Sequence, residues 1–202
     1  MTPTPITTTL DAEQQRIAGT ALQGTVVDLI DLIDLSLIAK QAHWIVIGPH
    51  FLAVHPALDE LATVARNFTD EAAERATVIG VSPDGRAATV AADAGTTGFA
   101  EGWTSDGEVV ETIAANLAAV IARLRASIES TEKADPVTQD LLIGITARLE
   151  QLHWMWQAQR TQPSAQRPRL GQLLVGQLRQ TVRERGGGRD QRSAPVASGS
   201  VP

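Results

Sequence analysis

Apolar residues recur every three or four positions in four stretches of this chain, which is the spacing of one face of an α-helix. The stretches run over about residues 11–45, 51–79, 105–131 and 135–159. In the first of them the repeating positions are Leu22, Val26, Leu29, Ile33 and Leu37. We therefore expect four long helices that turn these apolar faces inward.

The segments between these stretches contain residues that end helices. Gly48-Pro49 ends the first helix, and Asp135-Pro136 places a capping residue before a proline at the start of the fourth. Residues 80–102 are rich in Ala, Gly and Thr, and they are too many for a tight turn. We expect them to cross the bundle, with a short helix over residues 86–94. The pattern predicts an all-α four-helix bundle with a long crossover between its second and third helices.

Three regions of different composition follow from this division. Residues 1–10 form an N-terminal arm, residues 11–160 the bundle domain, and residues 161–202 an Arg-rich C-terminal extension. Within the extension, a short amphipathic helix is predicted by the spacing of Leu170, Leu174, Leu178 and Val182. The Ser, Ala, Pro and Gly that follow Gly188 predict disorder, so the extension is expected to be partly disordered.

Composition excludes several classes of protein. No run of the chain approaches the 18 or so apolar residues that span a bilayer, so no membrane partner is expected. The first ten residues contain no Lys or Arg and no apolar segment of signal-peptide length, and a cytoplasmic location is the expectation. The absence of cysteine excludes thiol chemistry and iron–sulfur clusters.

The net charge of −6 is unevenly distributed. Residues 1–156 carry 9 basic against 21 acidic side chains, whereas residues 157–202 carry 8 arginines against 2 acids. An acidic body favours cations as partners, and a basic tail favours polyanions.

Side chains that bind metals gather on the second predicted helix. His55 and Asp59 are four residues apart, as are Asp70 and Glu74, and His43 lies near the end of the first helix. At about 100° per residue, the four residues of the second helix lie about 100° to 200° away from its apolar stripe. This arrangement fits a solvated polar face, and it also fits two pairs of metal ligands.

Distance restricts how such ligands could share an ion. Asp59 and Asp70 lie eleven residues apart, about 16 Å along a helix, whereas metal–oxygen bonds are about 2 Å long. Two copies packed antiparallel could bring the His55/Asp59 pair of one beside the Asp70/Glu74 pair of the other. Mixed imidazole and carboxylate ligands suit iron better than magnesium or calcium.

Several runs of the sequence resemble the Dps family, the ferritin-like DNA-binding proteins from starved cells. The runs are Asp34-Leu-Ser-Leu-Ile-Ala-Lys-Gln-Ala-His-Trp44, Gly48-Pro-His-Phe-Leu-Ala-Val-His55, Asp59, Asp70-Glu-Ala-Ala-Glu-Arg75 and Gly80. The resemblance covers roughly residues 14–160. It implies a ferroxidase and iron-storage protein that assembles as a hollow homododecamer, oxidises ferrous iron preferably with hydrogen peroxide, and so protects DNA from oxidative damage.

The resemblance also implies roles for individual residues. His43, His55 and Asp59 of one subunit would face Asp70 and Glu74 of a two-fold mate to form the ferroxidase site. Trp44 would lie beside that site as an accessory residue.

Three further residues have two interpretations each. Lys40, one turn before Trp44, is an accessory residue that reaches a site carboxylate or else a solvated lysine. The resemblance implies an acid-lined pore for iron at the start of the fourth predicted helix, where Asp135 and Asp140 lie. Asp135 is equally well explained as a helix cap, and acids are common in a first helical turn.

The arginines of the extension are candidates for binding DNA phosphates without reading sequence. They are Arg167, Arg169, Arg179, Arg183, Arg185, Arg189 and Arg192. The alternative function is therefore a nucleoid-binding protein that acts mainly by non-specific DNA binding. A competing interpretation pins the tail onto the acidic shell, where its arginines would pair with Asp and Glu.

Overall fold

The computed structural model describes residues 7–23 and 28–160. Its helices are α1 (Ala12–Gln23), α2 (Asp28–Ile45), α3 (Phe51–Val78), α4 (Ala87–Asp93), α5 (Asp106–Thr131) and α6 (Pro136–Arg160). Two short strands, β1 (Val46–Ile47) and β2 (Thr104–Ser105), pair in parallel.

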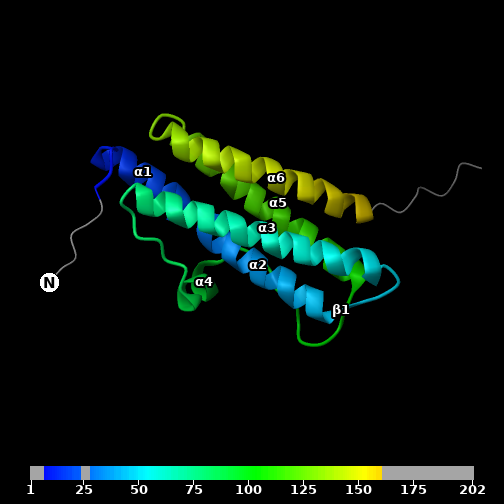
Figure 1. Ribbon diagram of the computed structural model, residues 1–202. Helices are drawn as coiled ribbons and strands as arrows, with labels where there is room; N and C mark the ends of the chain where they lie inside the picture. The colour runs from blue at the N-terminus through cyan, green and yellow to red at the C-terminus, as the bar shows by residue number, and fades with distance from the viewer. Residues whose placement is uncertain (1–6, 24–27, 161–202) are drawn as a thin grey trace, which may run out of the picture. The chain divides into compact units, whose positions relative to one another are not determined.

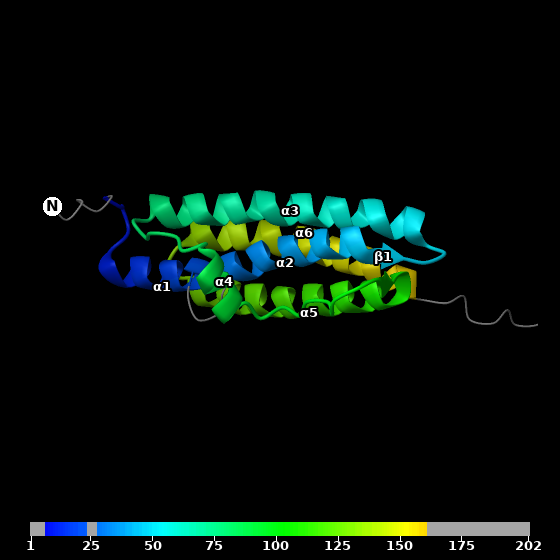
Figure 2. The same cartoon turned by 90° about the horizontal axis from the view of Figure 1, so that it is seen from below.

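The long helices α2, α3, α5 and α6 lie side by side, and α1 and α2 follow one another along the bundle (Figures 1 and 2). Contacts are most extensive between α2 and α3 and between α5 and α6. The segment between α3 and α5 runs back along the bundle and carries α4 against α2. The predicted all-α bundle with a long crossover is confirmed, including the short helix in the crossover. The helix predicted around residues 170–182 lies outside the described residues. Among the described helices, none combines the length and apolar character needed to cross a membrane.

Each long helix buries one apolar stripe in a shared core. On α3 and α5 the stripes follow the three- and four-residue spacing, from Val54 to Ala76 and from Val109 to Leu124. Leu142, Ile145, Leu149, Leu152 and Trp156 complete the core from α6.

One core expectation is wrong. The spacing predicts that Leu37 lies on the buried stripe of the first helix, but its side chain is 52% exposed. Apolar residues surround most of the circumference of α2, so spacing alone selects no single face. Packing in the bundle instead buries Leu32, Leu35 and Ala39.

Polar side chains hold the crossover on the bundle. The buried Asp31 of α2 accepts a hydrogen bond from the Gly95 amide at 2.8 Å and one from Arg123 Nε of α5. The buried Asn116 of α5 bonds both the amide and the carbonyl of Thr97, each at 2.8 Å. Because these partners satisfy buried polar groups, they fix the path of a connection that has few large apolar residues.

The turn between α2 and α3 is pinned to the start of α5. Gly48 has φ +139°, and a Cβ at this position would lie 2.5 Å from Asp106 Cγ. The Asp106 carboxylate accepts a hydrogen bond from the His50 amide at 2.6 Å. Glycine is therefore required here both by the backbone angle and by the close approach. This turn brings the end of α2 against the start of α3.

Candidate metal centre

His43 and His55 meet where α2 ends and α3 begins. Their ring centroids are 3.6 Å apart with 22° between the planes, and the Phe51 ring stacks on His55 at 4.7 Å. His43 belongs to the last turn of α2, where the partial negative charge of the helix end favours a cation.

The two imidazoles are oriented by a reciprocal pair of hydrogen bonds. His43 Nδ1 lies 2.9 Å from the His55 carbonyl oxygen, and His55 Nδ1 lies 2.9 Å from the His43 carbonyl oxygen. A carbonyl can only accept, so each Nδ1 carries the proton and, in the neutral ring, each Nε2 keeps its lone pair. A backbone partner at one nitrogen is how proteins prepare the other nitrogen to bind a metal.

These hydrogen bonds also have a structural role. The His43 carbonyl is one of the last in α2 and has no acceptor role within that helix, so His55 caps the helix end. The contact that orients the rings is thus also one that joins α2 to α3.

Asp59 lies one turn after His55 and is paired with Lys40. Lys40 Nζ donates to Asp59 Oδ1 at 2.5 Å, and His43 Nδ1 is 3.9 Å from the same oxygen. The hydrogen bond from Lys40, aided by the charge of Lys40 and the nearby imidazoles, lowers the pKa of Asp59 below its ordinary value. Lys40 therefore does reach Asp59 and is not a free, solvated lysine.

Asp70 and Glu74 are exposed and lie in the second half of α3, beyond the imidazole pair. The part of the chain that the structure describes holds no cluster of three or more His, Asp or Glu that could bind an ion. The five predicted ligands thus divide into His43, His55 and Asp59 near one end of α3, and Asp70 and Glu74 toward the other.

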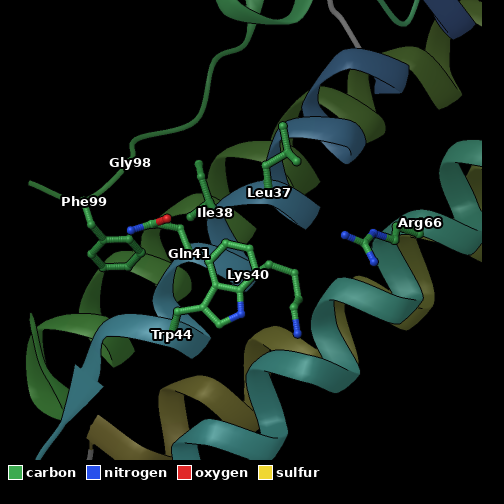
Figure 3. A pocket seen from close by; sticks show the side chains of 8 residues that line it. All are labelled: Leu37, Ile38, Lys40, Gln41, Trp44, Arg66, Gly98 and Phe99. Atoms are coloured by element: carbon green, nitrogen blue, oxygen red, sulfur yellow. The ribbon is translucent and has the colours of Figure 1, made fainter. Parts of the chain in front are cut away.

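A pocket of about 360 Å³ adjoins Lys40. It is lined by Leu37, Ile38, Lys40, Gln41, Trp44, Arg66, Gly98 and Phe99. Figure 3 shows the Lys40 side chain running beside the Trp44 indole toward α3. Its ammonium nitrogen is 5.8 Å from the indole centroid, and Trp44 is 64% exposed.

Asp135 and Asp140 lie in different environments. Asp135 is buried, receives Arg75 Nη2 at 2.5 Å and the Thr138 hydroxyl, and caps α6 by accepting from the Val137 amide at 3.3 Å. Asp140 is exposed on α6. The helix-cap interpretation of Asp135 is confirmed, and the pore role of both residues stays a prediction.

Sequence reasoning missed two partners in this region. Phe51 precedes His55 by four residues, a spacing that places both rings on one side of a helix and could have predicted their stacking. The pairing of Arg75 with Asp135 joins residues 60 positions apart, and no local signal marks it. The seven arginines of the extension lie outside the described residues.

Known proteins resemble this chain in sequence and in structure. The family model for the ferritin-like domain matches residues 28–164. The DNA protection during starvation protein of Mycolicibacterium smegmatis is 36% identical over 132 residues, which cover 62% of this chain and 68% of that protein. The DNA protection during starvation protein 2 of Deinococcus radiodurans is 33% identical over 138 residues, which cover 68% of this chain and 56% of that protein.

The comparison of structures agrees with that of sequences. The tetragonal form of Mycobacterium smegmatis Dps superposes with a TM-score of 0.72 at 30% identity, over 82% of this chain and 98% of that one. Dps92 from Deinococcus radiodurans gives a TM-score of 0.69 at 31% identity, over 73% of this chain and 87% of that one. The bundle, its crossover and these likenesses together show that the chain belongs to the Dps family of ferritin-like proteins.

Proposed function

We propose that this protein is a ferroxidase that stores iron and protects DNA from oxidative damage. The observation that carries the proposal is the imidazole pair of His43 and His55, whose Nδ1 atoms are both committed to carbonyls beside the carboxylate of Asp59. Two nitrogen ligands and one carboxylate make half of an iron site. Membership of the Dps family supports iron as the metal.

The other half of the site is proposed to come from a second subunit. Asp70 and Glu74 are exposed, one helical turn apart, and on the same side of α3 as Asp59. An antiparallel, two-fold pairing of α3 helices would bring Asp70 and Glu74 of the partner subunit to the imidazole end, and the reverse at the second site. Each pair of subunits would hold two sites.

The proposed chemistry is the oxidation of two ferrous ions by one molecule of hydrogen peroxide. Two electrons pass from two Fe²⁺ to the peroxide, its O–O bond breaks, and two protons are taken up to give two Fe³⁺ and two water molecules. The three carboxylates would stabilise the ferric charge. Because both electrons are delivered together, no hydroxyl radical is released. Ferric iron would collect inside a homododecameric shell, with Asp140 as the exposed acid that guides ferrous ions inward.

Loading with iron tests this function. Adding ferrous iron and peroxide to the metal-free protein is expected to give ferric absorbance that stays in solution, with about two ferrous ions consumed per peroxide. Sedimentation is expected to show particles of dodecamer size that gain mass with added iron. Ferric precipitate at the rate of a protein-free control would reject the proposal.

A second candidate function is non-specific DNA binding through the C-terminal extension. It is favoured by the excess of arginine over acid after residue 157 and by relatives named for DNA protection. A protein with this second function would lie in the cytoplasm, associated with the nucleoid.

A gel shift at low salt tests the DNA contact. The full chain is expected to retard duplex DNA, and a chain ending at Arg160 is expected to lose at least about tenfold in affinity, because seven of its cationic side chains are removed. Retardation should weaken steeply as salt is raised. Retardation by the shortened chain equal to that of the full chain would place the DNA contact elsewhere.

A further inference from the structure

Lys40 occupies the carboxylate that the proposed iron site needs. Its ammonium group lies 2.5 Å from Asp59 Oδ1, on the same oxygen that faces His43 at 3.9 Å. A divalent ion bound by Asp59 would be about 2 Å from a carboxylate oxygen. The metal and the ammonium group would then lie close together, and their like charges would repel.

The ion pair is held in place by the surroundings of Lys40. The Lys40 side chain is 21% exposed, although Asp59 is 55% exposed. Its chain extends from α2 beside the Trp44 indole, as Figure 3 shows, so that little freedom remains to the ammonium group. A pair with one restrained member loses less side-chain entropy than an ordinary surface pair.

We propose that Lys40 is a built-in competitor of the metal: it occupies Asp59 in the metal-free protein and leaves when a divalent ion binds. This inference rests on the proposed function, because it assumes that Asp59 is a ligand. Lys40 acts through Asp59 and is a positioning residue. It keeps the carboxylate turned toward the imidazoles. Because the metal must displace Lys40, the site binds the metal more weakly than its ligands alone would.

The pocket beside Trp44 offers the displaced ammonium group a place to move. Lys40 already lines this pocket of about 360 Å³, and its nitrogen is 5.8 Å from the indole ring. The ammonium group is therefore already within cation–π range of the ring, and this contact can remain when Lys40 leaves the carboxylate. The described lining residues include no acid that would hold Lys40 in another ion pair.

The chain contains only two lysines, which makes the displacement directly observable. They are Lys40 and the exposed Lys133. In the assembled full-length protein, with lysine ε-carbons labelled with ¹³C, zinc is added as a divalent ion without redox chemistry. The Lys40 signal is expected to shift with zinc occupancy while the Lys133 signal stays fixed. A Lys40 signal that does not move while zinc binds overturns the inference.

Variants give a second measurement. Lys40→Gln is expected to raise zinc affinity about fivefold, the equivalent of about 1 kcal/mol, because the competitor is gone. Lys133→Gln is the matched control and should leave affinity unchanged. If Lys40→Gln lowers the affinity or leaves it unchanged, Lys40 does not compete with the metal, and the inference fails.

A third variant distinguishes failure of the proposed function from failure of the inference about Lys40. Zinc affinity is also measured in the His43→Ala/His55→Ala variant. If this variant binds zinc as tightly as the unaltered chain, the proposed site is wrong, and the inference about Lys40 falls with it. If the variant binds weakly but Lys40→Gln does not bind more tightly, the inference about Lys40 alone is wrong.

Discussion

Replacing His43 and His55 together with alanine is expected to lower the initial rate of peroxide-dependent iron oxidation by at least about 100-fold. Removing a residue that only hydrogen-bonds to a metal ligand already lowers metal affinity or activity about 10- to 100-fold. This variant removes two of the ligands themselves. The measurement is ferric absorbance in stopped flow. The double variant His50→Ala/His153→Ala removes the chain's other two histidines and should oxidise iron at the unaltered rate.

A complementary variant tests whether the site is shared. Asp70→Asn/Glu74→Gln is expected to lose a similar factor in rate. If the two double variants are unfolded, mixed and reassembled, half of the two-fold pairs should contain one of each, and each such pair regains one of its two sites. About one quarter of the unaltered rate should therefore return. Recovery no greater than that of either variant alone would contradict shared sites.

The imidazole pair also caps α2, so the variant needs a check on folding. Loss of the two hydrogen bonds from Nδ1 to carbonyls should cost about 1–3 kcal/mol. Circular dichroism and sedimentation separate a folded, inactive assembly from an unfolded chain. An unchanged oxidation rate in a folded His43→Ala/His55→Ala assembly would reject these ligands.

Asp135→Asn is expected to destabilise the protein by about 2–4 kcal/mol at pH 7. Asparagine keeps the helix cap but leaves Arg75, which is 17% exposed, without its charged partner, and breaking a buried ion pair is costly. The thermal midpoint should fall by about 5–15 °C for a chain of this size, at matched protein concentration because assembly contributes. Asp140→Asn, on the exposed side of the same helix, should stay within about 0.5 kcal/mol.

The destabilisation caused by Asp135→Asn should shrink as the pH falls. Burial raises the pKa of Asp135, but the Thr138 hydroxyl and the Arg75 guanidinium outweigh it, so the pKa is lowered overall. A lowered pKa means that the stabilisation is complete above the unfolded-state pKa of about 4 and is lost as pH falls through the lower folded value. The midpoints of the unaltered chain and Asp135→Asn should therefore converge as the pH falls below about 4. A constant difference down to pH 2 would exclude the ion pair as the cause.

The helices of this fold could be predicted because each has a long apolar period and clear end signals. Gly48-Pro49 lies between the end of α2 at Ile45 and the start of α3 at Phe51, and α6 begins at Pro136, directly after Asp135. The candidate ligands stay a prediction: His55 and Asp59 share a face of one helix, which also fits a solvated surface, and the full set of five is implied by the resemblance to the Dps family. Leu37 was misplaced because α2 is apolar around most of its surface, and only its neighbours decide which side is buried.

Contacts between distant residues had no such signal. Nothing local distinguishes the buried Asp31 from the half-buried Asp34 three residues later, because the difference lies in Arg123 on another helix. The reciprocal hydrogen bonds of His43 and His55 depend on the turn that brings α2 to α3, and the ligand spacing alone does not predict them.

The hydrogen bonds that anchor the crossover determine the order in which parts of the bundle can form during synthesis. Asp31 meets Arg123 across 92 residues of sequence and the Gly95 amide across 64, whereas α2 and α3 are neighbours along the chain. During synthesis the first hairpin can pair early, but Asp31 has no countercharge until Arg123 has left the ribosome. Until then the apolar surface of that hairpin remains uncovered, and the completed bundle waits for the second half of the chain.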